Sequence, residues 1–166
     1  LLFKKEAFRF NYGLDYVDSK CIAHKMVVAA SNSGLPAIII NPTYMIGPYD
    51  AKPSSGKLLI NLYKGKVPAF PPGGKNFVSV KDVAVGICNA LSTGEVGESY
   101  ILGNQNLSYR DFFTKVANVL NIQTPRFQLP KSILLFIGYL NGTLSDITKI
   151  PPAISSEVVR ASFDNH

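Results

Sequence analysis

The stretch Gly34-Leu-Pro-Ala-Ile-Ile-Ile-Asn-Pro-Thr-Tyr-Met-Ile-Gly-Pro48 decides the fold that the sequence predicts. Its unbroken apolar run, residues 37–40, is typical of a parallel strand buried on both faces. Pro42 ends this strand, and a Pro/Gly-rich loop follows. A helix is predicted just before it, over residues 15–32, so the segment forms half of a doubly wound α/β unit. Ligands of such folds bind beyond the carboxyl ends of the strands, which places loop 41–48 at a ligand site.

Tyr16 and Lys20 stand four residues apart in the predicted helix and therefore share one helical face. An ammonium about 5 Å from a phenol, at an effective dielectric of about 20, favours the phenolate by roughly 3 kcal/mol. This attraction lowers the pKa of the phenol from its ordinary value near ~10 toward working pH. The pair can then transfer a proton, although the same spacing also occurs on ordinary solvated helix faces.

The rest of the chain alternates helices with extended segments. Residues 99–102 are the second strand candidate. A helix over residues 80–91 has Val83, Ile87 and Leu91 spaced to face a core, and Ser108 is the predicted N-cap of a helix over residues 109–120. The other predicted elements are a helix over residues 57–63, an extended segment over 65–70, a surface turn over 71–75, and helices over 132–140 and 154–161.

Two features of a complete dinucleotide-binding domain are missing from the sequence. No glycine-rich strand-to-helix turn with G-x-G-x-x-G spacing is present to hold a pyrophosphate. Two parallel strands are also too few for a sheet that is buried on both faces. The chain is therefore expected to be part of a larger protein.

Composition predicts a soluble, cytoplasmic protein with a packed core. Hydrophobic residues make up 46% and charged residues 17% of the chain. Cys21 and Cys88 are predicted to be small buried hydrophobes rather than a disulfide, and two histidines suggest no metal site. The longest apolar run, residues 133–140, is too short to span a bilayer.

The formal net charge is +6, yet the pattern of lysines argues against nucleic-acid binding. The lysines are scattered over separate segments, without an arginine-rich helix or interleaved aromatic residues. They are interpreted as a solvated surface. An alternative is that one or two of them contact a cofactor phosphate or an anionic substrate.

Five short motifs, taken together in their order and spacing, resemble those of a known family. They are Tyr16-Val-Asp-Ser-Lys20, Asn41-Pro-Thr-Tyr-Met-Ile-Gly-Pro48, Asn76-Phe-Val-Ser-Val-Lys-Asp-Val-Ala84, Gly97-Glu-Ser-Tyr-Ile-Leu-Gly103 and Asn106-Leu-Ser108. The chain resembles the extended short-chain dehydrogenase/reductases, also called the NAD-dependent epimerase/dehydratase family. Within this family, the last two motifs are most similar to those of the dihydroflavonol-reductase-like and 3β-hydroxysteroid-dehydrogenase-like branches.

The resemblance implies roles for particular residues. Tyr16 would be the general acid/base, and Lys20 would hold the nicotinamide ribose and lower the pKa of the phenol. The cofactor would be NAD or NADP, and no metal is implied. Its contacts would be Tyr16, Lys20, Pro42, Thr43, Tyr44 and Met45, and the candidate substrate contacts are Tyr49, Lys57 and Phe77. The serine or threonine that this family places about two dozen residues before the tyrosine would precede residue 1, so the resemblance implies that the chain is the C-terminal part of a larger enzyme.

The resemblance also implies a chain that passes three times between two lobes. Residues 1–48 and 76–104 would belong to a Rossmann-type dinucleotide-binding domain, and residues 49–75 and 105–166 to a smaller, mostly helical substrate lobe. The fold class is therefore α/β, with a doubly wound parallel sheet.

The predicted function is an NAD(P)-dependent oxidoreductase that transfers a hydride to or from a carbonyl or hydroxyl carbon. One alternative is a nucleotide-sugar epimerase or dehydratase with tightly bound NAD, and another is a non-catalytic interaction protein. The 166-residue polypeptide is expected to be inactive by itself. Its partner would be a small-molecule substrate, with neither nucleic acid nor a membrane span, and a homodimer is left open.

Overall fold

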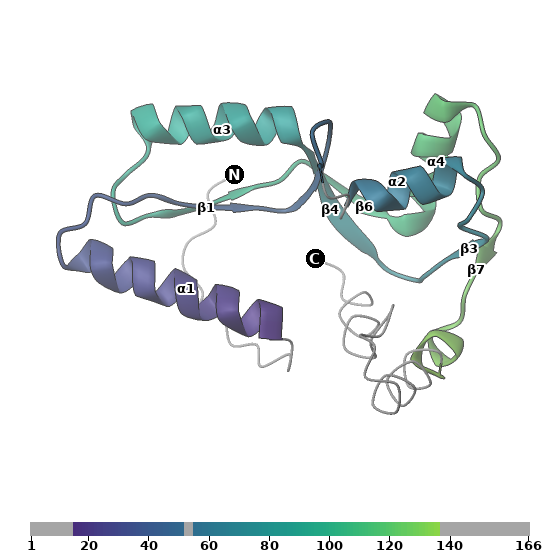
Figure 1. Ribbon diagram of the computed structural model, residues 1–166, viewed down its shortest axis with the longest axis horizontal. Helices are drawn as coiled ribbons and strands as arrows, with labels where there is room; N and C mark the ends of the chain where they lie inside the picture. The colour runs from purple at the N-terminus through teal and green to yellow at the C-terminus, as the bar shows by residue number, and fades with distance from the viewer. Residues whose placement is uncertain (1–14, 52–54, 137–166) are drawn as a thin grey trace. The chain divides into compact units, whose positions relative to one another are not determined.

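The computed structural model describes residues 15–51 and 55–136, with side chains from residue 17 onward (Figure 1). The chain folds into two compact units. The first unit contains residues up to Tyr49 together with Phe77–Gln105, and the second contains Asp50–Asn76 together with the residues from Asn106 on. Which unit binds a cofactor and which binds a substrate stays a prediction.

The first unit is a small α/β layer. Strand β1 (Ile39–Pro42) pairs in parallel with β5 (Ser99–Leu102), in a register that runs from Ile39 opposite Ser99 to Pro42 opposite Leu102. Helices α1 (Asp15–Asn32) and α3 (Val80–Thr93) lie on opposite faces of this pair (Figure 1). Helices on both faces of parallel strands are the doubly wound arrangement, and the predicted α/β fold class is confirmed.

A second sheet has the strand order β2-β4-β6. Strand β2 (Tyr44–Ile46) lies parallel to β4 (Gly74–Ser79), with Tyr44 opposite Phe77, and β6 is Gln105–Ser108. Phe77 and Val78 are buried, as expected for a strand that has a partner on each side.

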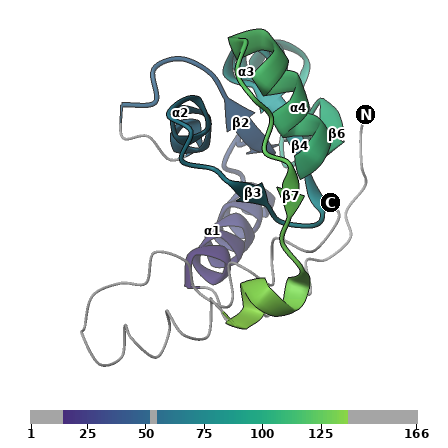
Figure 2. The same cartoon turned by 90° about the vertical axis from the view of Figure 1, so that its right-hand side faces the viewer.

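The second unit packs helices against a short strand pair. Helices α2 (Gly56–Tyr63) and α4 (Tyr109–Leu120) contact each other, and β3 (Ala69–Phe70) pairs in parallel with β7 (Phe127–Gln128), as Figure 2 shows. Phe113 of α4 is 1% exposed and forms the centre of the core. Its ring lies 5.6 Å from Phe112, 6.2 Å from Phe70 and 6.4 Å from Tyr109, centroid to centroid. Aromatic contacts at these distances are favourable beyond the burial of their area.

Helix ends follow local chemistry. The Ser108 hydroxyl accepts a hydrogen bond from the Asp111 amide at 3.0 Å, so the predicted N-cap of α4 is confirmed. Ser79 caps α3 in the same way, by accepting from the Lys81 amide at 3.1 Å. Helix α4 ends at Asn121, whose left-handed backbone lets the Ile122 amide reach the Ala117 carbonyl at 3.0 Å.

Several predictions about strands need correction. The strand expected over residues 37–40 covers Ile39–Pro42, because its extent is set by the residues of β5 that it pairs with. The sequence offered two good strand candidates, whereas the described residues form seven strands. The turn expected over residues 71–75 ends early, since Gly74 and Lys75 already belong to β4. Strands this short are set by long-range pairing and not by a local apolar run.

Two predictions about burial are also wrong. On α3, Val83 is buried, but Ile87 is exposed and Leu91 is 79% exposed. Cys88 on the same helix is exposed, while Cys21 on α1 is half-buried, and both are free thiols. On the side of α3 that approaches the strands, Gly86 packs against the Leu102 side chain.

Some expectations concern residues outside the described ranges. The helix predicted over residues 132–140 is present over 131–136, and the rest of it, like the helix predicted over 154–161, lies outside the described residues. Within the described ranges, no helix combines the length and apolar character that crossing a membrane requires.

Candidate functional site

Helix α1 carries Tyr16 and Lys20 one turn apart, near its first residue. Tyr16, Lys20 and His24 form a row at i, i+4 and i+8 along one side of the helix. On this side His24 Nε2 lies 3.5 Å from Ser99 Oγ of β5, so the row follows the side by which α1 approaches the strands. The Lys20 side chain is exposed, and the Tyr16 side chain lies outside the described part of the structure.

The direction of α1 brings its first turns to the ligand-binding end of the strands. Figure 1 shows that α1 runs opposite to β1, so its start and the carboxyl end of β1 lie at the same end of the first unit. In open α/β sheets this is the end at which ligands bind. The structure thus places the start of the Tyr16–Lys20 helix and the loop after Pro42 at one end.

The loop after β1 is fastened by Thr43. Its amide donates to the Leu102 carbonyl at 3.0 Å, and its hydroxyl lies 3.3 Å from the same oxygen. Further along, Gly47 lies so close to Val80 that a Cβ at Gly47 would be 2.1 Å from Val80 Cγ1. The backbone between these two points is therefore held on both sides.

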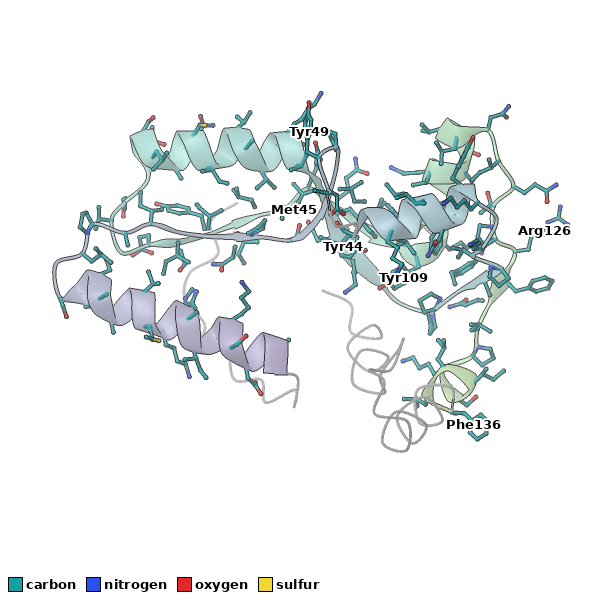
Figure 3. The ribbon with its side chains drawn as sticks, viewed as in Figure 1. Tyr44, Met45, Tyr49, Tyr109, Arg126 and Phe136 are labelled. Atoms are coloured by element: carbon teal, nitrogen blue, oxygen red, sulfur yellow. The ribbon has the colours of Figure 1, made fainter. Side chains whose placement is uncertain are left out.

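Tyr44 and Phe77, two of the predicted contact residues, lie together. Their rings meet edge to face, with centroids 5.4 Å apart. Phe77 is only 6% exposed, whereas Pro42 and Met45 are exposed; Tyr44 and Met45 are labelled in Figure 3. The buried Phe77 ring therefore packs against the Tyr44 ring.

The remaining predicted substrate residues, Tyr49 and Lys57, are both exposed. Tyr49 is 98% exposed and has a left-handed backbone, with φ 71°, which is unfavourable for an aromatic residue. Lys57 lies in the first turn of α2, in the second unit.

The predicted contact residues of the first unit are suited to the nicotinamide and its ribose and not to the pyrophosphate of a dinucleotide. Lys20, Pro42 and Met45 are exposed at the ligand-binding end of the first unit, where a nicotinamide and its ribose could be contacted. No described residues form the glycine-rich turn that would hold the pyrophosphate. Three or more metal-ligating side chains do not gather anywhere in the described ranges.

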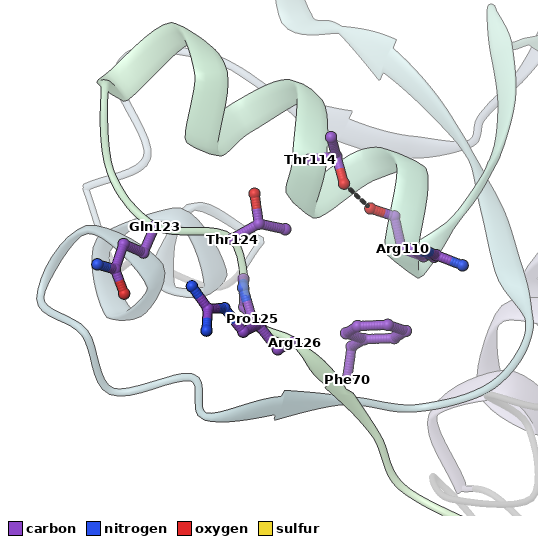
Figure 4. A pocket seen from close by; sticks show the side chains of 7 residues that line it. All are labelled: Phe70, Arg110, Thr114, Gln123, Thr124, Pro125 and Arg126. Carbon is purple, nitrogen blue, oxygen red and sulfur yellow. Dashed lines mark hydrogen bonds between the residues drawn. The ribbon is translucent and has the colours of Figure 1, made fainter.

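One feature of the second unit was not predicted from the sequence. A cavity of about 480 Å³ lies between α4, Phe70 of β3 and the loop over residues 123–126, and two arginines, Arg110 and Arg126, line it (Figure 4). In β4, burial lowers the pKa of the Lys75 ammonium. No motif in the sequence indicated the cavity, because its lining residues come from separate segments of the chain.

Comparison of the sequence with known proteins identifies a matching family. The model of the NAD dependent epimerase/dehydratase family matches residues 4–103. A protein assigned by name as a dihydroflavonol 4-reductase, from Synechocystis sp., is 30% identical over 152 residues, which are 89% of this chain and 44% of that protein. The chain thus spans less than half the length of this curated relative.

Solved structures show the same fold. The crystal structure of gox2253 is 34% identical and superposes with a TM-score of 0.73, covering 90% of this chain and 46% of that one. A nucleoside-diphosphate-sugar epimerase from Pseudomonas aeruginosa has 22% identity and a TM-score of 0.74, covering 98% of this chain and 52% of that one. The family's description as NAD dependent agrees with the predicted nicotinamide cofactor. The match of residues 4–103 to the family model, together with the shared fold, shows that this chain belongs to the NAD dependent epimerase/dehydratase family.

Proposed function

We propose that the chain is part of an NAD(P)-dependent oxidoreductase that interconverts a carbonyl and a hydroxyl group. The observation that carries the proposal is the position of α1, which begins at the ligand-binding end of β1 with Tyr16 and Lys20 one turn apart. The 30% identity to a protein named as a reductase favours this reaction over others in the family.

In this proposal NAD or NADP, when bound, supplies or accepts the hydride. During reduction the Tyr16 hydroxyl donates a proton to the substrate oxygen, so that no alkoxide accumulates there. During oxidation the Tyr16 phenolate accepts the proton of the substrate hydroxyl. Lys20 keeps the phenol acidic enough for this exchange and binds the ribose. The substrate is a small molecule with a ketone or secondary alcohol.

The loop after β1 has a positioning role in this scheme. Thr43 fixes the loop to β5 through the Leu102 carbonyl. Phe77 packs against the Tyr44 ring, and Pro42 and Met45 expose an apolar surface that the nicotinamide would contact. Tyr49 and Lys57 are proposed to contact the substrate.

Replacing Tyr16 tests the proposal in the active protein that contains this chain. Tyr16→Phe keeps the ring and removes the transferable proton, so kcat should fall by roughly 10²- to 10⁴-fold, the range expected for the loss of a general acid. Cofactor affinity, measured by fluorescence titration with NADPH or NADH, should change little. A Tyr16→Phe protein with near-normal turnover would overturn the assignment.

A nucleotide-sugar epimerase or dehydratase is the second candidate, because the family includes both activities by its description. Such an enzyme would use the same pair for a transient oxidation and would retain its NAD. Its product would have the redox state of the substrate. Net consumption of NADPH favours the reductase, whereas a cofactor that copurifies and is not consumed favours this candidate.

A further inference from the structure

The cavity of the second unit is built by three separate segments. Arg110 and Thr114 come from the first turns of α4, Phe70 is the last residue of β3, and residues 123–126 form the loop between α4 and β7. Its volume of about 480 Å³ lies in the range of pockets that hold small molecules.

The walls of the cavity are held in place. Phe70 is 4% exposed and packs on the buried Phe113. The loop over residues 123–126 is tied at one end by the left-handed Asn121 that closes α4, and at the other by the pairing of β7 with β3. Just beyond β7, the Leu129 amide donates to the Phe70 carbonyl at 2.9 Å. The cavity is therefore formed before any ligand arrives.

Its polar lining is rich in hydrogen-bond donors. Its lining includes two arginines, Gln123 and Thr124, whose side chains all carry hydrogen-bond donors. In residues 15–51 and 55–136, none of these four side chains makes a hydrogen bond or an ion pair. The Thr114 hydroxyl is already used, since it donates to the Arg110 carbonyl at 2.8 Å.

No carboxylate lines the cavity to neutralise the two arginines. Asp111, the neighbour of Arg110 in sequence, lies 2.6 Å from the Ser108 hydroxyl at the start of α4. Asp50, the other acidic residue among the described residues of the second unit, accepts from the Gly56 amide at 3.0 Å. Eight lysines and arginines stand against these two aspartates in the same residues. The field around the cavity therefore attracts anions.

The arrangement of the lining also indicates the shape of the ligand. Figure 4 shows the Arg126 guanidinium on the side of Gln123, with Arg110 and the Phe70 ring on the opposite side. Phe70 and Pro125 add apolar surface between the polar groups. Guanidinium groups recognise the planar pairs of oxygens in phosphates and carboxylates.

We propose that this cavity binds a small organic anion in which a phosphate or carboxylate is attached to a flat apolar group. Arg126, Gln123 and Thr124 bind the oxyanion, and Phe70 and Pro125 contact the apolar part. The site goes beyond the proposed oxidoreductase function, because none of these residues belongs to the Tyr16–Lys20 pair.

Calorimetric titration tests the proposal, with phenyl phosphate, benzoate and inorganic phosphate as probes and benzyl alcohol as the neutral control. Phenyl phosphate should bind more tightly than inorganic phosphate, because only the former has a ring, and benzyl alcohol should bind weakly or not at all. The preference between phenyl phosphate and benzoate identifies the oxyanion. Arg126→Gln should weaken binding by about tenfold or more, as expected for the loss of a charged hydrogen bond.

Lys64→Gln is the matched control, since Lys64 is an exposed cation of the same unit outside the cavity. It should change affinity less than about twofold, an effect expected of remote surface charges. Tyr16→Phe should bind the probes like the unmodified protein, which separates failure of this site from failure of the proposed function. Gln123→Ala provides a second test if Arg126→Gln does not fold, as judged by circular dichroism, and it should also weaken the binding of phenyl phosphate.

Three results would overturn the proposal. The first is no binding of any anionic probe at millimolar concentration. The second is equal weakening by Arg126→Gln and Lys64→Gln, which would indicate a general basic surface. The third is binding of benzyl alcohol as tight as that of phenyl phosphate, which would indicate an apolar cavity only.

Discussion

Thr43 shows how a single residue can position a loop at the end of a strand. It directs its backbone amide and its side-chain hydroxyl to one acceptor, the Leu102 carbonyl. Leu102 is the last residue of β5, so the loop is fixed beside the carboxyl end of the neighbouring strand. The exposed Pro42 and Met45 on either side are held at this point, although neither makes the attachment itself.

Tyr49 is a residue whose backbone is set by its surroundings. Before it, Gly47 is packed against Val80, and after it the Asp50 carboxylate accepts from the Gly56 amide. These constraints hold Tyr49 at a positive φ, which costs of order 1–2 kcal/mol for a residue other than glycine. A strained residue with a fully exposed ring fits the proposed role in substrate contact.

Among single substitutions, Lys20→Met should impair the enzyme more than Tyr16→Phe, because it should reduce both cofactor affinity and kcat. The substitution removes the ammonium and keeps most of the stem, so it should weaken cofactor binding and also lower kcat. Without the ammonium, the pKa of the Tyr16 phenol should rise toward its ordinary value near ~10.

Alcohol oxidation needs the Tyr16 phenolate as a base, so the pH optimum of oxidation should move upward in Lys20→Met. The measurements are the pH profile of kcat for alcohol oxidation and a cofactor titration. Lys25→Met, on the exposed side of the same helix, is the control and should leave the profile unchanged. An unshifted optimum in Lys20→Met would remove the proposed role of the lysine.

Among the elements, α3 shows why apolar spacing alone gave the wrong face. A Cβ at Gly86 would lie 2.7 Å from Leu102 Cδ1, the end of a side chain of β5. The side of α3 that approaches the strands therefore carries Val83 and small residues. Small residues allow close approach of a helix to a strand, but they give no strong signal in an apolar pattern.

Strand β4 depends on close backbone packing at Gly74. A Cβ there would lie 2.3 Å from the Leu107 carbonyl oxygen of β6 and 2.9 Å from the Ser108 Cα. Both atoms belong to backbone, which cannot rotate away. Glycine at this position is thus required by the spacing of the two strands.

We expect Gly74→Ala to reduce the free energy of unfolding by about 2–3 kcal/mol, a typical cost of overpacking. Urea denaturation followed by circular dichroism measures this change. Gly86→Ala is the comparison, because its Cβ meets only the movable end of the Leu102 side chain and alanine favours a helix by about 1 kcal/mol over glycine. Equal losses in the two variants would contradict the account of β4.

At the scale of the whole molecule, the first unit exposes apolar side chains on several elements. Ile22 and Met26 of α1, Val85 and Leu91 of α3, and Ile101 of β5 are all exposed. The pair β1–β5 by itself covers little of these helices, as expected when two strands carry helices on both faces. The core of the second unit, around Phe113, is better closed.

The 166-residue polypeptide by itself should not bind NAD(H) or NADP(H) appreciably. Its sequence contains no G-x-G-x-x-G turn after a strand, and the pyrophosphate supplies much of the anionic surface that such a turn recognises. Calorimetry with each cofactor checks this. Micromolar binding would contradict this prediction. If that binding persisted in Lys20→Met, it would not involve the proposed ribose contact and would indicate a pyrophosphate-binding site that the sequence does not reveal.

The sequence by itself determined the features that depend on neighbouring residues. The helix over residues 15–32 and the helix over residues 109–120 with its Ser108 cap follow from local spacing and capping, and the structure has both at the predicted residues. The family followed from five motifs, and the family match confirms it. The roles of Tyr16 and Lys20 stay predictions, because they rest on spacing and resemblance.

Only the tertiary structure decided the features that join distant parts of the chain. The two-residue strands β3 and β7 exist because each supplies the partner of the other across more than fifty residues. The attachment of Thr43 to Leu102, the close approach of Gly74 to Leu107 and the cavity between Phe70 and Arg126 likewise join distant segments. Hydrogen bonding and packing of this kind depend on which segments meet in space, and a local pattern of residues does not contain that information.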